Sequence, residues 1–290
     1  MQFKTVTIIG VGLLGGSLAR DLKAKKICKR IVGVCRSQET VKYALDAKIV
    51  DEVLPIKEAV VDVDLIVFAT PMQTMLPLLK QINDVISADT LITDVGSVKN
   101  ELYEQLKNNF PERLKQFVLA HPIAGGEQTG VTASKLGLFD NKHLVIANTE
   151  EVSQEKVSQI DHLWQAVGAK VITMSLTEHD AIFAKTSHLP HVIAFTLVNF
   201  LNQQDEKEDL FEMAAAGFYD FTRIASSDAH MWRDICVTNR EEIVAAIDGY
   251  QAQIDQIREY VNNADQESIF DYFAAAKAAR NNGLEKKQSR

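Results

Sequence analysis

Residues 5–20 read Thr5-Val6-Thr7-Ile8-Ile9-Gly10-Val11-Gly12-Leu13-Leu14-Gly15-Gly16-Ser17-Leu18-Ala19-Arg20. A short β-branched apolar run enters a glycine-rich turn, and leucines spaced four residues apart then follow a helical period. Gly10 permits a tight turn, Gly12 lets the backbone approach a pyrophosphate, and Gly15 lets the helix lie close to the strand. The free N–H groups of the helix N-terminus would then point at the phosphates. We therefore predict a dinucleotide site here; the alternative is a glycine-rich turn without a ligand.

Composition limits the classes of protein to which this chain can belong. With 290 residues, 46% of them hydrophobic, the chain is long enough for two ordinary domains with apolar cores. Its formal net charge of -8 argues against a general nucleic-acid or anionic-membrane binder, since both repel an acidic surface. An anionic substrate would therefore be held by a few placed cations.

Cysteine usage predicts a reduced protein. Cys28, Cys35 and Cys236 lie far apart and form no Cys-x-x-Cys pair, so they suggest neither a disulfide framework nor a zinc site. Residues 1–4 lead straight into the first strand and leave no room for a signal peptide, and we expect no apolar run of membrane-spanning length. We expect a cytoplasmic protein that binds no metal, membrane or nucleic acid.

Strand-like and helix-like segments alternate through residues 1–174. This alternation predicts a doubly wound parallel sheet, whose ligands gather at the carboxyl ends of the strands. The expected strands are 5–9, 30–35, 64–71, 90–94, 117–120, 144–147 and 171–174, and the expected helices include 40–47, 72–86, 98–106 and 160–167.

A second, all-helical domain is predicted over residues 175–282. Residues 177–180 resemble a capping box, and 192–201, 232–237 and 241–261 carry helical apolar spacing. Residues 283–290 are polar and charged, which favours a frayed tail. One apolar stripe serves either the core, which we favour, or a partner subunit; it comprises Ile243, Ile247, Ile254, Ile257 and Val261.

The end of the second strand indicates which cofactor is used. An NAD-binding fold carries an acidic residue there that bonds the ribose hydroxyls, but this chain has Cys35, followed by Arg36 and Ser37. A guanidinium and a hydroxyl suit a 2′-phosphate, so NADP is favoured; alternatively Arg36 stacks on adenine or is solvated, and NAD is used. The predicted cofactor-binding residues are Gly10, Gly12, Leu13, Leu14, Gly15, Arg36, Ser37, Thr70, Pro71 and Ser97.

Two loops after predicted strands carry further chemistry. Ser97, in Asp94-Val-Gly-Ser-Val-Lys99, either reaches the nicotinamide and a nearby base or caps the following helix. His121 ends a strand before a glycine-rich loop and is a natural general base, since its ordinary pKa lies near neutrality; a structural role is the alternative. His179 and His230 suit helix starts or surfaces, and no histidine pair has the spacing of a metal site.

Five motifs together resemble the prephenate/arogenate dehydrogenase family over nearly the whole chain. They are Gly10-Val-Gly-Leu-Leu-Gly-Gly-Ser17, Asp94-Val-Gly-Ser-Val-Lys99, His121-Pro-Ile-Ala-Gly-Gly-Glu127, Ser187-His-Leu-Pro-His191 and Phe221-Thr-Arg-Ile-Ala225. The resemblance implies an α/β, Rossmann-type domain followed by an all-α dimerisation domain that makes a homodimer. It also implies oxidative decarboxylation of prephenate to 4-hydroxyphenylpyruvate, or of arogenate to tyrosine, with NAD or NADP.

The resemblance assigns roles to individual residues. His121 would accept the proton of the ring hydroxyl, Ser97 would orient His121 and the nicotinamide, and Arg223 would bind a substrate carboxylate. A guanidinium fork suits this task in an acidic protein, although an ion pair with a nearby aspartate, Asp220 or Asp228, is the alternative for Arg223. The other implied substrate-site residues are His191, His188, Ser187, Trp232, Gly126 and Glu127.

Other functions remain open. Gly126 stands where relatives often carry a small hydroxyl residue, which leaves the choice between prephenate and arogenate as the substrate undecided. The fold also resembles 3-hydroxyacid dehydrogenases, for which Lys185 is the nearest catalytic lysine, but the glycine and asparagine expected around it are absent. A nucleotide-sensing regulator without catalysis is the remaining alternative, and the presence of Ser97, His121 and Arg223 together argues against it.

Overall fold

The computed structural model describes residues 3–126, 128–204 and 210–288. The chain divides into two compact units, Met1–Arg240 and Glu241–Arg290. The domain boundary expected between residues 174 and 175 falls inside the first unit and stays a prediction, as does a cytoplasmic location.

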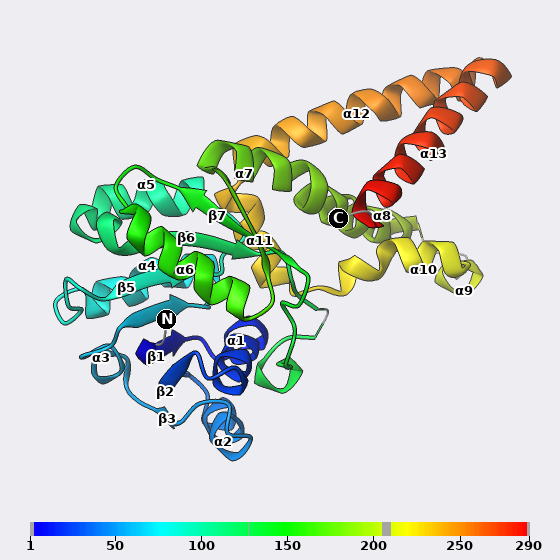
Figure 1. Ribbon diagram of the computed structural model, residues 1–290. Helices are drawn as coiled ribbons and strands as arrows, with labels where there is room; N and C mark the ends of the chain where they lie inside the picture. Colours follow the sequence, from blue (N-terminus) through cyan, green and yellow to red (C-terminus); the bar gives the residue numbers. More distant parts are fainter. Residues whose placement is uncertain (1–2, 127, 205–209, 289–290) are drawn as a thin grey trace. The chain divides into compact units, whose positions relative to one another are not determined.

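An eight-stranded sheet lies at the centre of the first unit, with the strand order β3-β2-β1-β4-β5-β6-β7-β8 (Figure 1). The strands β1 to β6 pair in parallel, as predicted. The middle strands are continuous apolar runs because helices cover both faces of the sheet. The strands are β1 (Phe3–Ile9), β2 (Cys28–Val34), β3 (Glu52–Val53), β4 (Leu65–Phe68), β5 (Leu91–Asp94), β6 (Phe117–Pro122), β7 (His143–Asn148) and β8 (Lys170–Ser175).

The expectation of a wholly parallel sheet is wrong at one pair. β7 runs antiparallel to β6, with Ala120 opposite Ile146, while β8 is parallel to β7. A parallel pair needs a long crossover, usually helical. Between β6 and β7 the described residues form only a short 3₁₀ turn, η2 (Val131–Ala133), so the chain returns in the opposite direction. The two-residue strand β3 was not predicted at all, because it is too short to show a pattern.

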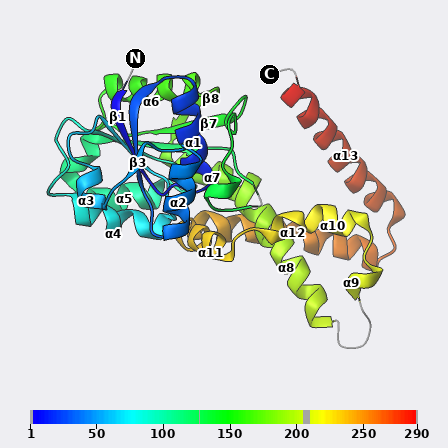
Figure 2. The ribbon, with the colours of Figure 1, turned by 90° about the horizontal axis from the view of Figure 1, so that it is seen from below.

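Helices cover the two faces of the sheet with separate apolar cores. Side chains of α1, α2 and α6 pack on one face, and those of α4 and α5 pack on the other; Figure 2 shows α1 and α6 across the sheet from α4 and α5. Leu18 and Leu22 are fully buried, as the helical period predicts. The helices are α1 (Leu13–Ala24), α2 (Gln38–Asp46), α3 (Ile56–Ala59), α4 (Met72–Ile82), α5 (Asn100–Asn109) and α6 (Gln154–Ala166), with the 3₁₀ turn η1 (Pro111–Gln116).

Two predicted helix starts are wrong. Ser97 does not cap α5, which begins at Asn100; instead the carboxylate of Asp180 accepts the backbone N–H groups of Lys99 at 2.9 Å and Asn100 at 2.8 Å. The capping box of the next region is formed by Ser175 and Glu178, rather than within residues 177–180. In both cases the cap lies outside the segment in which a local pattern placed it.

Helices continue to the end of the first unit. A five-residue π-helix, Ala184–His188, joins α7 to α8 without a break, so that one long helical segment changes its pitch in the middle. The elements are α7 (Leu176–Phe183), the π-helix η3 (Ala184–His188), α8 (Leu189–Gln204), α9 (Leu210–Met213), α10 (Ala216–Thr222), η4 (Arg223–Ser226) and α11 (Ala229–Thr238).

That long segment corrects the expectation that no apolar run approaches membrane-spanning length. Residues Leu176–Gln204 are long and apolar enough to cross a membrane by length and composition alone, with a mean hydropathy of 1.2. The same stretch carries His179, Asp180 and His188, which are buried and hydrogen-bonded within the first unit. A helix that contributes polar groups to a protein interior does not present them to lipid, so we treat it as a protein-packing helix.

The second unit consists of α12 (Arg240–Asn262) and α13 (Gln266–Gln288), joined by a short turn. The rings of Tyr260 and Tyr272 meet edge to face, with centroids 6.5 Å apart. The predicted core role of the apolar stripe is wrong at Ile254 and Val261, which are 43% and 61% exposed. The predicted frayed tail is also wrong over residues 283–288, which continue α13; the rest of it lies outside the described residues.

Candidate active site

The glycine-rich loop contains two kinds of glycine. Gly10 has a φ of +99°, and a Cβ built there would lie 2.6 Å from the carbonyl oxygen of Ala69; one built on Gly15 would lie 2.2 Å from the carbonyl oxygen of Gly10. These two glycines are required by the protein's own packing. A Cβ on Gly12 would meet nothing within 4 Å. Gly12 is the N-cap residue of α1 and makes no side-chain hydrogen bond to the helix. The open space beside Gly12 therefore lies next to the free N–H groups of the first helical turn.

The loop after β4 lies against the glycine loop. Thr70 approaches Gly10, and its Oγ1 is buried without a hydrogen-bond partner among the described residues, while Pro71 is the N-cap residue of α4. Leu13 and Leu14 are half-buried and pack on the core. The open space at Gly12, the uncapped helix end and the lone hydroxyl fit a dinucleotide pyrophosphate, which needs close backbone approach and hydrogen-bond donors.

Cys35 follows β2 and faces the glycine loop, since its thiol accepts a hydrogen bond from the backbone N–H of Val11. Burial raises the pKa of this thiol, which keeps it neutral. Arg36 is exposed beside it. Ser37 caps α2: its hydroxyl accepts the N–H of Thr40 at 3.1 Å and donates to the Thr40 hydroxyl at 2.8 Å.

His121 lies at the carboxyl end of β6 and is 9% exposed. Its Nδ1 lies 2.9 Å from Nε2 of His179, and the ring of Phe183 packs edge-on at 5.0 Å. Burial, followed by the electrostatic influence of the neighbouring His179 and Lys99 side chains, holds the pKa of His121 well below its ordinary value of 6.5. The imidazole is therefore neutral near pH 7 and able to accept a proton.

His179 was not predicted to be a residue of the site. It belongs to α7, as the helix-start expectation allowed, but it is fully buried rather than at the surface. Its Nδ1 lies 2.6 Å from Oδ1 of Asp180. A signal was present: a histidine and an aspartate sit together before the apolar run Ala181-Ile182-Phe183-Ala184, and buried polar groups of this kind need partners.

An ion pair supports the same region from the neighbouring strand. Lys99 and Asp94 are fully buried and in contact, and Lys99 Nζ also donates to the carbonyl oxygen of Ala120 at 2.9 Å. The other oxygen of Asp94 accepts the N–H of Ala120 at 3.1 Å. These bonds hold the loop after β5 against β6 beside His121. We call Asp94, Lys99, His121, His179 and Asp180 the polar cluster.

Ser97 is half-buried on the same loop, two residues before Lys99. The structure thus places the predicted pair, Ser97 and His121, on adjacent strand ends. The side chain in hydrogen-bond contact with His121 Nδ1, however, is His179.

A second group of predicted residues gathers around Trp232 on α11. The ring of His191 stacks on the indole at 3.7 Å, and His191 Nδ1 donates to the carbonyl oxygen of Ser187 at 2.9 Å. His188 is buried, and its ring centroid lies 6.1 Å from that of the indole. Burial lowers the pKa of His188 to about 4. Among the described residues, neither Nε2 of His188 nor Nε1 of Trp232 has a hydrogen-bond partner although both are buried.

Asn239 connects this group to the polar cluster. Its Nδ2 donates to the carbonyl oxygen of Asp180 at 3.0 Å and lies 3.1 Å from Nδ1 of His188. Arg223, at the start of η4, is exposed. Burial lowers the pKa of His191 and the charge of Arg223 lowers it further, against the hydrogen bond to Ser187. Arg223 therefore lies within electrostatic reach of the residues around Trp232.

The loop after β6 reaches back toward the glycine loop. Gly126 is exposed, and a Cβ built on it would lie 3.6 Å from a methyl group of Leu13 at the start of α1. Glu127, the other residue predicted here, lies outside the described residues. Gly126 therefore lies beside the start of α1, in the predicted cofactor region.

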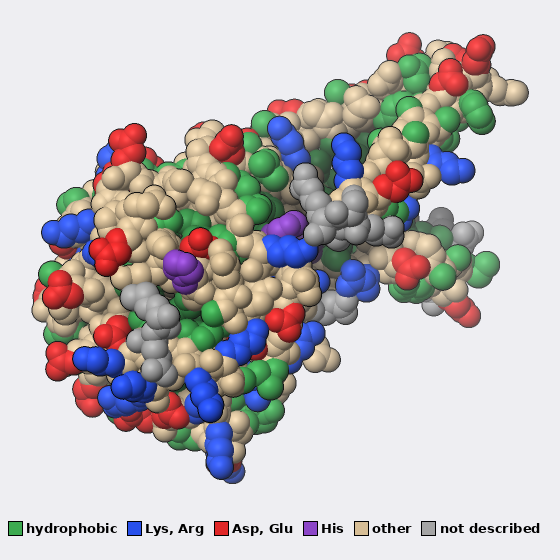
Figure 3. All heavy atoms as spheres, viewed as in Figure 1, with side chains coloured by type: hydrophobic (Ala, Val, Ile, Leu, Met, Phe, Trp, Pro, Cys, Tyr) green, Lys and Arg blue, Asp and Glu red, His purple; other side chains and the backbone are tan. Residues whose placement is uncertain are grey.

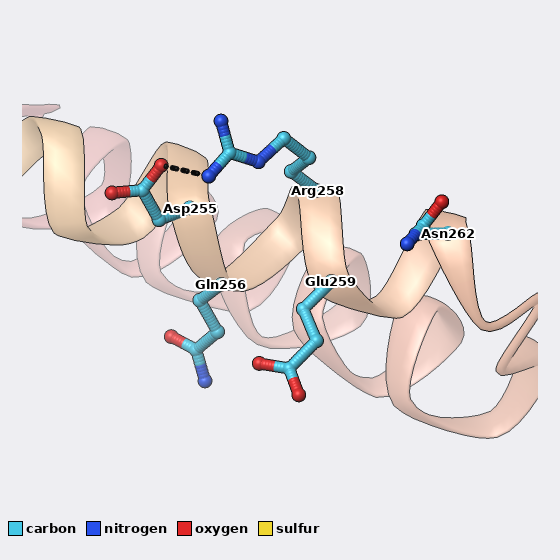
Figure 4. A pocket seen from close by; sticks show the side chains of 5 residues that line it. All are labelled: Asp255, Gln256, Arg258, Glu259 and Asn262. Atoms are coloured by element: carbon cyan, nitrogen blue, oxygen red, sulfur yellow. Dashed lines mark ion pairs between the residues drawn. The ribbon is translucent and has the colours of Figure 1, made fainter.

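Two further features of the described residues were considered as functional centres, namely the charged surface and a hollow on α12. Acidic and basic side chains are interspersed on the face shown in Figure 3, and no group of three or more metal-ligating side chains occurs among the described residues. A hollow on α12 is lined by exposed polar side chains of one helix and contains none of the predicted site residues (Figure 4). Its lining residues are Asp255, Gln256, Arg258, Glu259 and Asn262.

Together these features define a class. A doubly wound sheet with an open glycine loop at its carboxyl edge, and a neutral buried histidine on a neighbouring strand of that edge, belong to an NAD(P)-dependent dehydrogenase.

Comparison with known proteins agrees. Residues 18–173 match the nucleotide-binding domain model of prephenate dehydrogenase, and residues 175–275 match its dimerization domain model. The chain belongs to the prephenate dehydrogenase family. It is 36% identical to prephenate dehydrogenase of Bacillus subtilis, over 95% of this chain and 75% of the relative. It is 30% identical to cyclohexadienyl dehydrogenase of Zymomonas mobilis, over 96% of this chain and 95% of the relative.

The same architecture occurs in a crystal structure of prephenate dehydrogenase from Aquifex aeolicus in complex with hydroxyphenyl propionate and NAD+. That chain superposes with a TM-score of 0.91 and 34% sequence identity, over 97% of this chain and 98% of the other. The predicted fold and family are thereby confirmed.

Proposed function

We propose that the protein converts prephenate into 4-hydroxyphenylpyruvate and carbon dioxide, with hydride transfer to NADP or NAD. The observation that carries the proposal is the neutral, buried His121 at the carboxyl end of β6, in the same compact unit as the open glycine loop. Relatives named prephenate dehydrogenase and a solved structure with a phenolic ligand support this substrate class.

In the proposed mechanism His121 accepts the proton of the ring hydroxyl. Its lowered pKa keeps the imidazole neutral, which a proton acceptor requires. A bound nicotinamide would supply the acceptor for the hydride on the carbon that bears this hydroxyl. The ring carboxylate leaves as carbon dioxide, and the ring becomes aromatic, which supplies most of the driving force. The protein therefore contributes mainly positioning and a fixed electrostatic environment.

The cofactor would be held by the glycine loop and the start of α1. Gly12 leaves space for the pyrophosphate, and the hydroxyl of Thr70 offers a buried partner. We propose the same region for Gly10, Leu13, Leu14, Gly15, Pro71 and Ser97.

NADP is the proposed preference. Cys35 carries no charge at the position where a carboxylate would repel a 2′-phosphate, and Arg36 is exposed next to it. The hydroxyl of Ser37 already caps α2, so Arg36 carries most of this proposal. The Aquifex relative was crystallised with NAD+, so a preference for NAD is the competing outcome.

Substrate recognition is proposed for Arg223 and the residues around Trp232. Prephenate is a dianion, and a guanidinium can hold a carboxylate through two hydrogen bonds. Nε1 of Trp232 is a donor without a partner among the described residues, and His191 shields one face of the indole. On this basis Arg223→Ala raises KM for the substrate with a smaller change in kcat, whereas a purely structural ion pair would leave KM unchanged. Supporting substrate contacts are proposed for His191, His188, Ser187, Gly126 and Glu127.

The deciding experiment is the initial rate of nicotinamide reduction with prephenate, measured in parallel with NADP and NAD. A faster rate with NADP supports both the reaction and the role of Arg36; a faster rate with NAD keeps the reaction and rejects the NADP preference. Arogenate dehydrogenase is the second candidate, because the Zymomonas relative is named a cyclohexadienyl dehydrogenase. Reduction with arogenate but not prephenate would select it.

Absence of any rate would favour a different protein class. Lys185, the lysine of the 3-hydroxyacid dehydrogenase alternative, is exposed on the π-helix, away from the interior that holds His121 and His188. A cofactor-sensing regulator would bind NADP or NAD without ever reducing it.

We also propose a homodimer formed through the helical region. Large apolar side chains of this region are exposed in the single chain, and a match to a dimerization domain model agrees with such a role. Sedimentation equilibrium is expected to give twice the mass of the chain; a monomer at micromolar concentration would reject the proposal. Among these exposed residues are Phe200, Met213, Tyr219, Phe221, Val237, Ile254, Val261, Phe270 and Phe273.

A further inference from the structure

A neutral histidine carries a hydrogen on only one of its two ring nitrogens, and only the other nitrogen can accept a proton. His121 therefore acts as a base only in the tautomer that leaves its reactive nitrogen bare. The structure contains a chain of three side chains that selects one tautomer: His121, His179 and Asp180.

The chain begins at Asp180. Its Oδ1 accepts the N–H of Lys99 at 2.9 Å and its Oδ2 accepts the N–H of Asn100 at 2.8 Å. Backbone N–H groups can only donate, so both carboxylate oxygens act as acceptors. Nδ1 of His179 lies 2.6 Å from Oδ1 and must therefore carry a hydrogen to donate.

His179, the middle residue of the three, determines in turn where His121 carries its hydrogen. His179 is fully buried, and burial lowers its pKa, so the ring is neutral and has a single hydrogen, at Nδ1. Its Nε2 is then an acceptor. Nδ1 of His121, 2.9 Å away, must carry a hydrogen to donate to it, and Nε2 of His121 remains bare.

We propose that His179, held by Asp180, is a positioning residue that fixes His121 in the tautomer with a bare Nε2. This role rests on the proposed function, in which His121 takes the substrate proton. The same principle operates in the serine protease triad, where a buried carboxylate holds a histidine in its reactive tautomer. Here a second histidine lies between the carboxylate and the base.

Other groups that face His121 do not replace this contact. Lys99 and His188 approach from the loop after β5 and from the π-helix, and each lowers the pKa of His121. Lys99 Nζ is bonded to Asp94 and to the Ala120 carbonyl, and Nδ1 of His188 is bonded to Asn239. Phe183 packs against both histidine rings and limits their rotation without offering an acceptor.

Two amide substitutions separate the two contacts of His179. The amide of glutamine reaches the place of Nε2, so His179→Gln keeps an acceptor for His121. The shorter asparagine reaches the place of Nδ1, so His179→Asn keeps only the contact to Asp180. We expect His179→Asn to lower kcat by about 10- to 100-fold, part of the roughly 10²- to 10⁴-fold that a positioned base supplies, with His179→Gln within about threefold of wild type.

In both variants KM is expected to change by less than about threefold, because His179 is not proposed to touch substrate. Thermal unfolding of both variants provides the stability control. Equal kcat values in folded Gln and Asn variants, or a larger loss in the Gln variant, would overturn the proposal, since a structural role would follow stability instead.

A direct readout needs neither substrate nor cofactor. In 15N-histidine-labelled wild-type protein at pH 7, the nitrogen shifts of His121 and His179 are expected to show hydrogens on Nδ1 and bare Nε2 atoms; His121→Asn and His179→Gln assign the signals. A hydrogen on Nε2 of His121 would overturn the proposal. If the tautomer is as expected but neither prephenate nor arogenate is oxidised, the proposed function fails and the positioning of His121 stands.

Discussion

The first unit has two interiors that are equally buried and held together in different ways. Between β4 and α1, Leu18, Leu65 and Val67 are fully buried in apolar contacts. At its carboxyl edge the polar cluster is buried too, but its members are linked to one another by specific hydrogen bonds and an ion pair. Apolar burial is non-directional, whereas a buried polar group needs a particular partner in a particular place. The core therefore determines whether the chain folds, and the polar cluster determines which atoms can react.

The largest contrast is expected from one substitution in each interior. His121→Asn removes the proposed base and should lower kcat by about 10²- to 10⁴-fold with little change in stability. Leu18→Ala should cost about 2–5 kcal/mol of folding free energy and leave kcat of the folded protein nearly intact. Steady-state kinetics and urea unfolding of both variants test this. Unchanged turnover in His121→Asn would end the assignment of His121 as base.

Lys99 tests whether the polar cluster also supports the fold. Lys99→Met leaves Asp94 buried without its cation, which typically costs about 3–5 kcal/mol. Because the charge of Lys99 lowers the pKa of His121, the lower limb of the pH–rate profile should also move to higher pH. Urea unfolding and the pH dependence of kcat measure the two effects. A variant as stable as wild type would show that the cluster matters only for chemistry.

Acid should weaken the polar interior selectively. Burial lowers the pKa of His188 to about 4, below the ordinary value of 6.5, so between these values the unfolded chain binds the proton first. Above pH 6.5 His188 does not lower the free energy of unfolding. As the pH drops from 6.5 toward 4, protonation linked to this group lowers the free energy of unfolding by about 3 kcal/mol. His188→Asn, whose amide can still meet Asn239, should give a shallower dependence in urea unfolding between pH 4 and 8. An equally steep curve would assign the effect to other groups.

The same contrast between a structural and a functional role occurs within the four residues from Gly12 to Gly15. Gly15→Ala would place a methyl group against the Gly10 carbonyl and should cost about 1–3 kcal/mol or more, as overpacking does. Gly12→Ala meets no protein atom and should leave stability nearly unchanged while raising KM for NADP. Thermal unfolding and cofactor titration distinguish the two. A Gly12→Ala protein with normal cofactor KM would mean that the pyrophosphate does not approach that backbone.

The sequence predicted the apolar interior better than the polar one. Apolar runs gave the long strands, and the helical period of Leu18 and Leu22 gave the buried face of α1. These signals are local, because a residue's polarity and its neighbours' spacing determine which side it buries. The antiparallel β7 was missed because strand direction depends on the connection, which has no apolar period of its own.

Contacts within the polar cluster could not be predicted in the same way. His179 meets His121 across 58 residues, and Asp180 caps α5 across 80. The family motifs named His121 and Ser97, but no local pattern connects either residue to α7. Only the folded chain shows that the side chain in contact with Nδ1 of His121 is another histidine.

The π-helix between α7 and α8 has a consequence for how insertions and deletions would act on this chain. The i→i+5 hydrogen bonds of a π-helix close a wider turn than those of an α-helix, so the length of Ala184–His188 determines how α8 is rotated relative to α7. His179 lies before this segment and His191 after it, so their angular phase is set by its length. An insertion or deletion within this segment would therefore change how the support of the base and the residues around Trp232 are placed relative to each other, although His179 and His191 themselves stay unchanged.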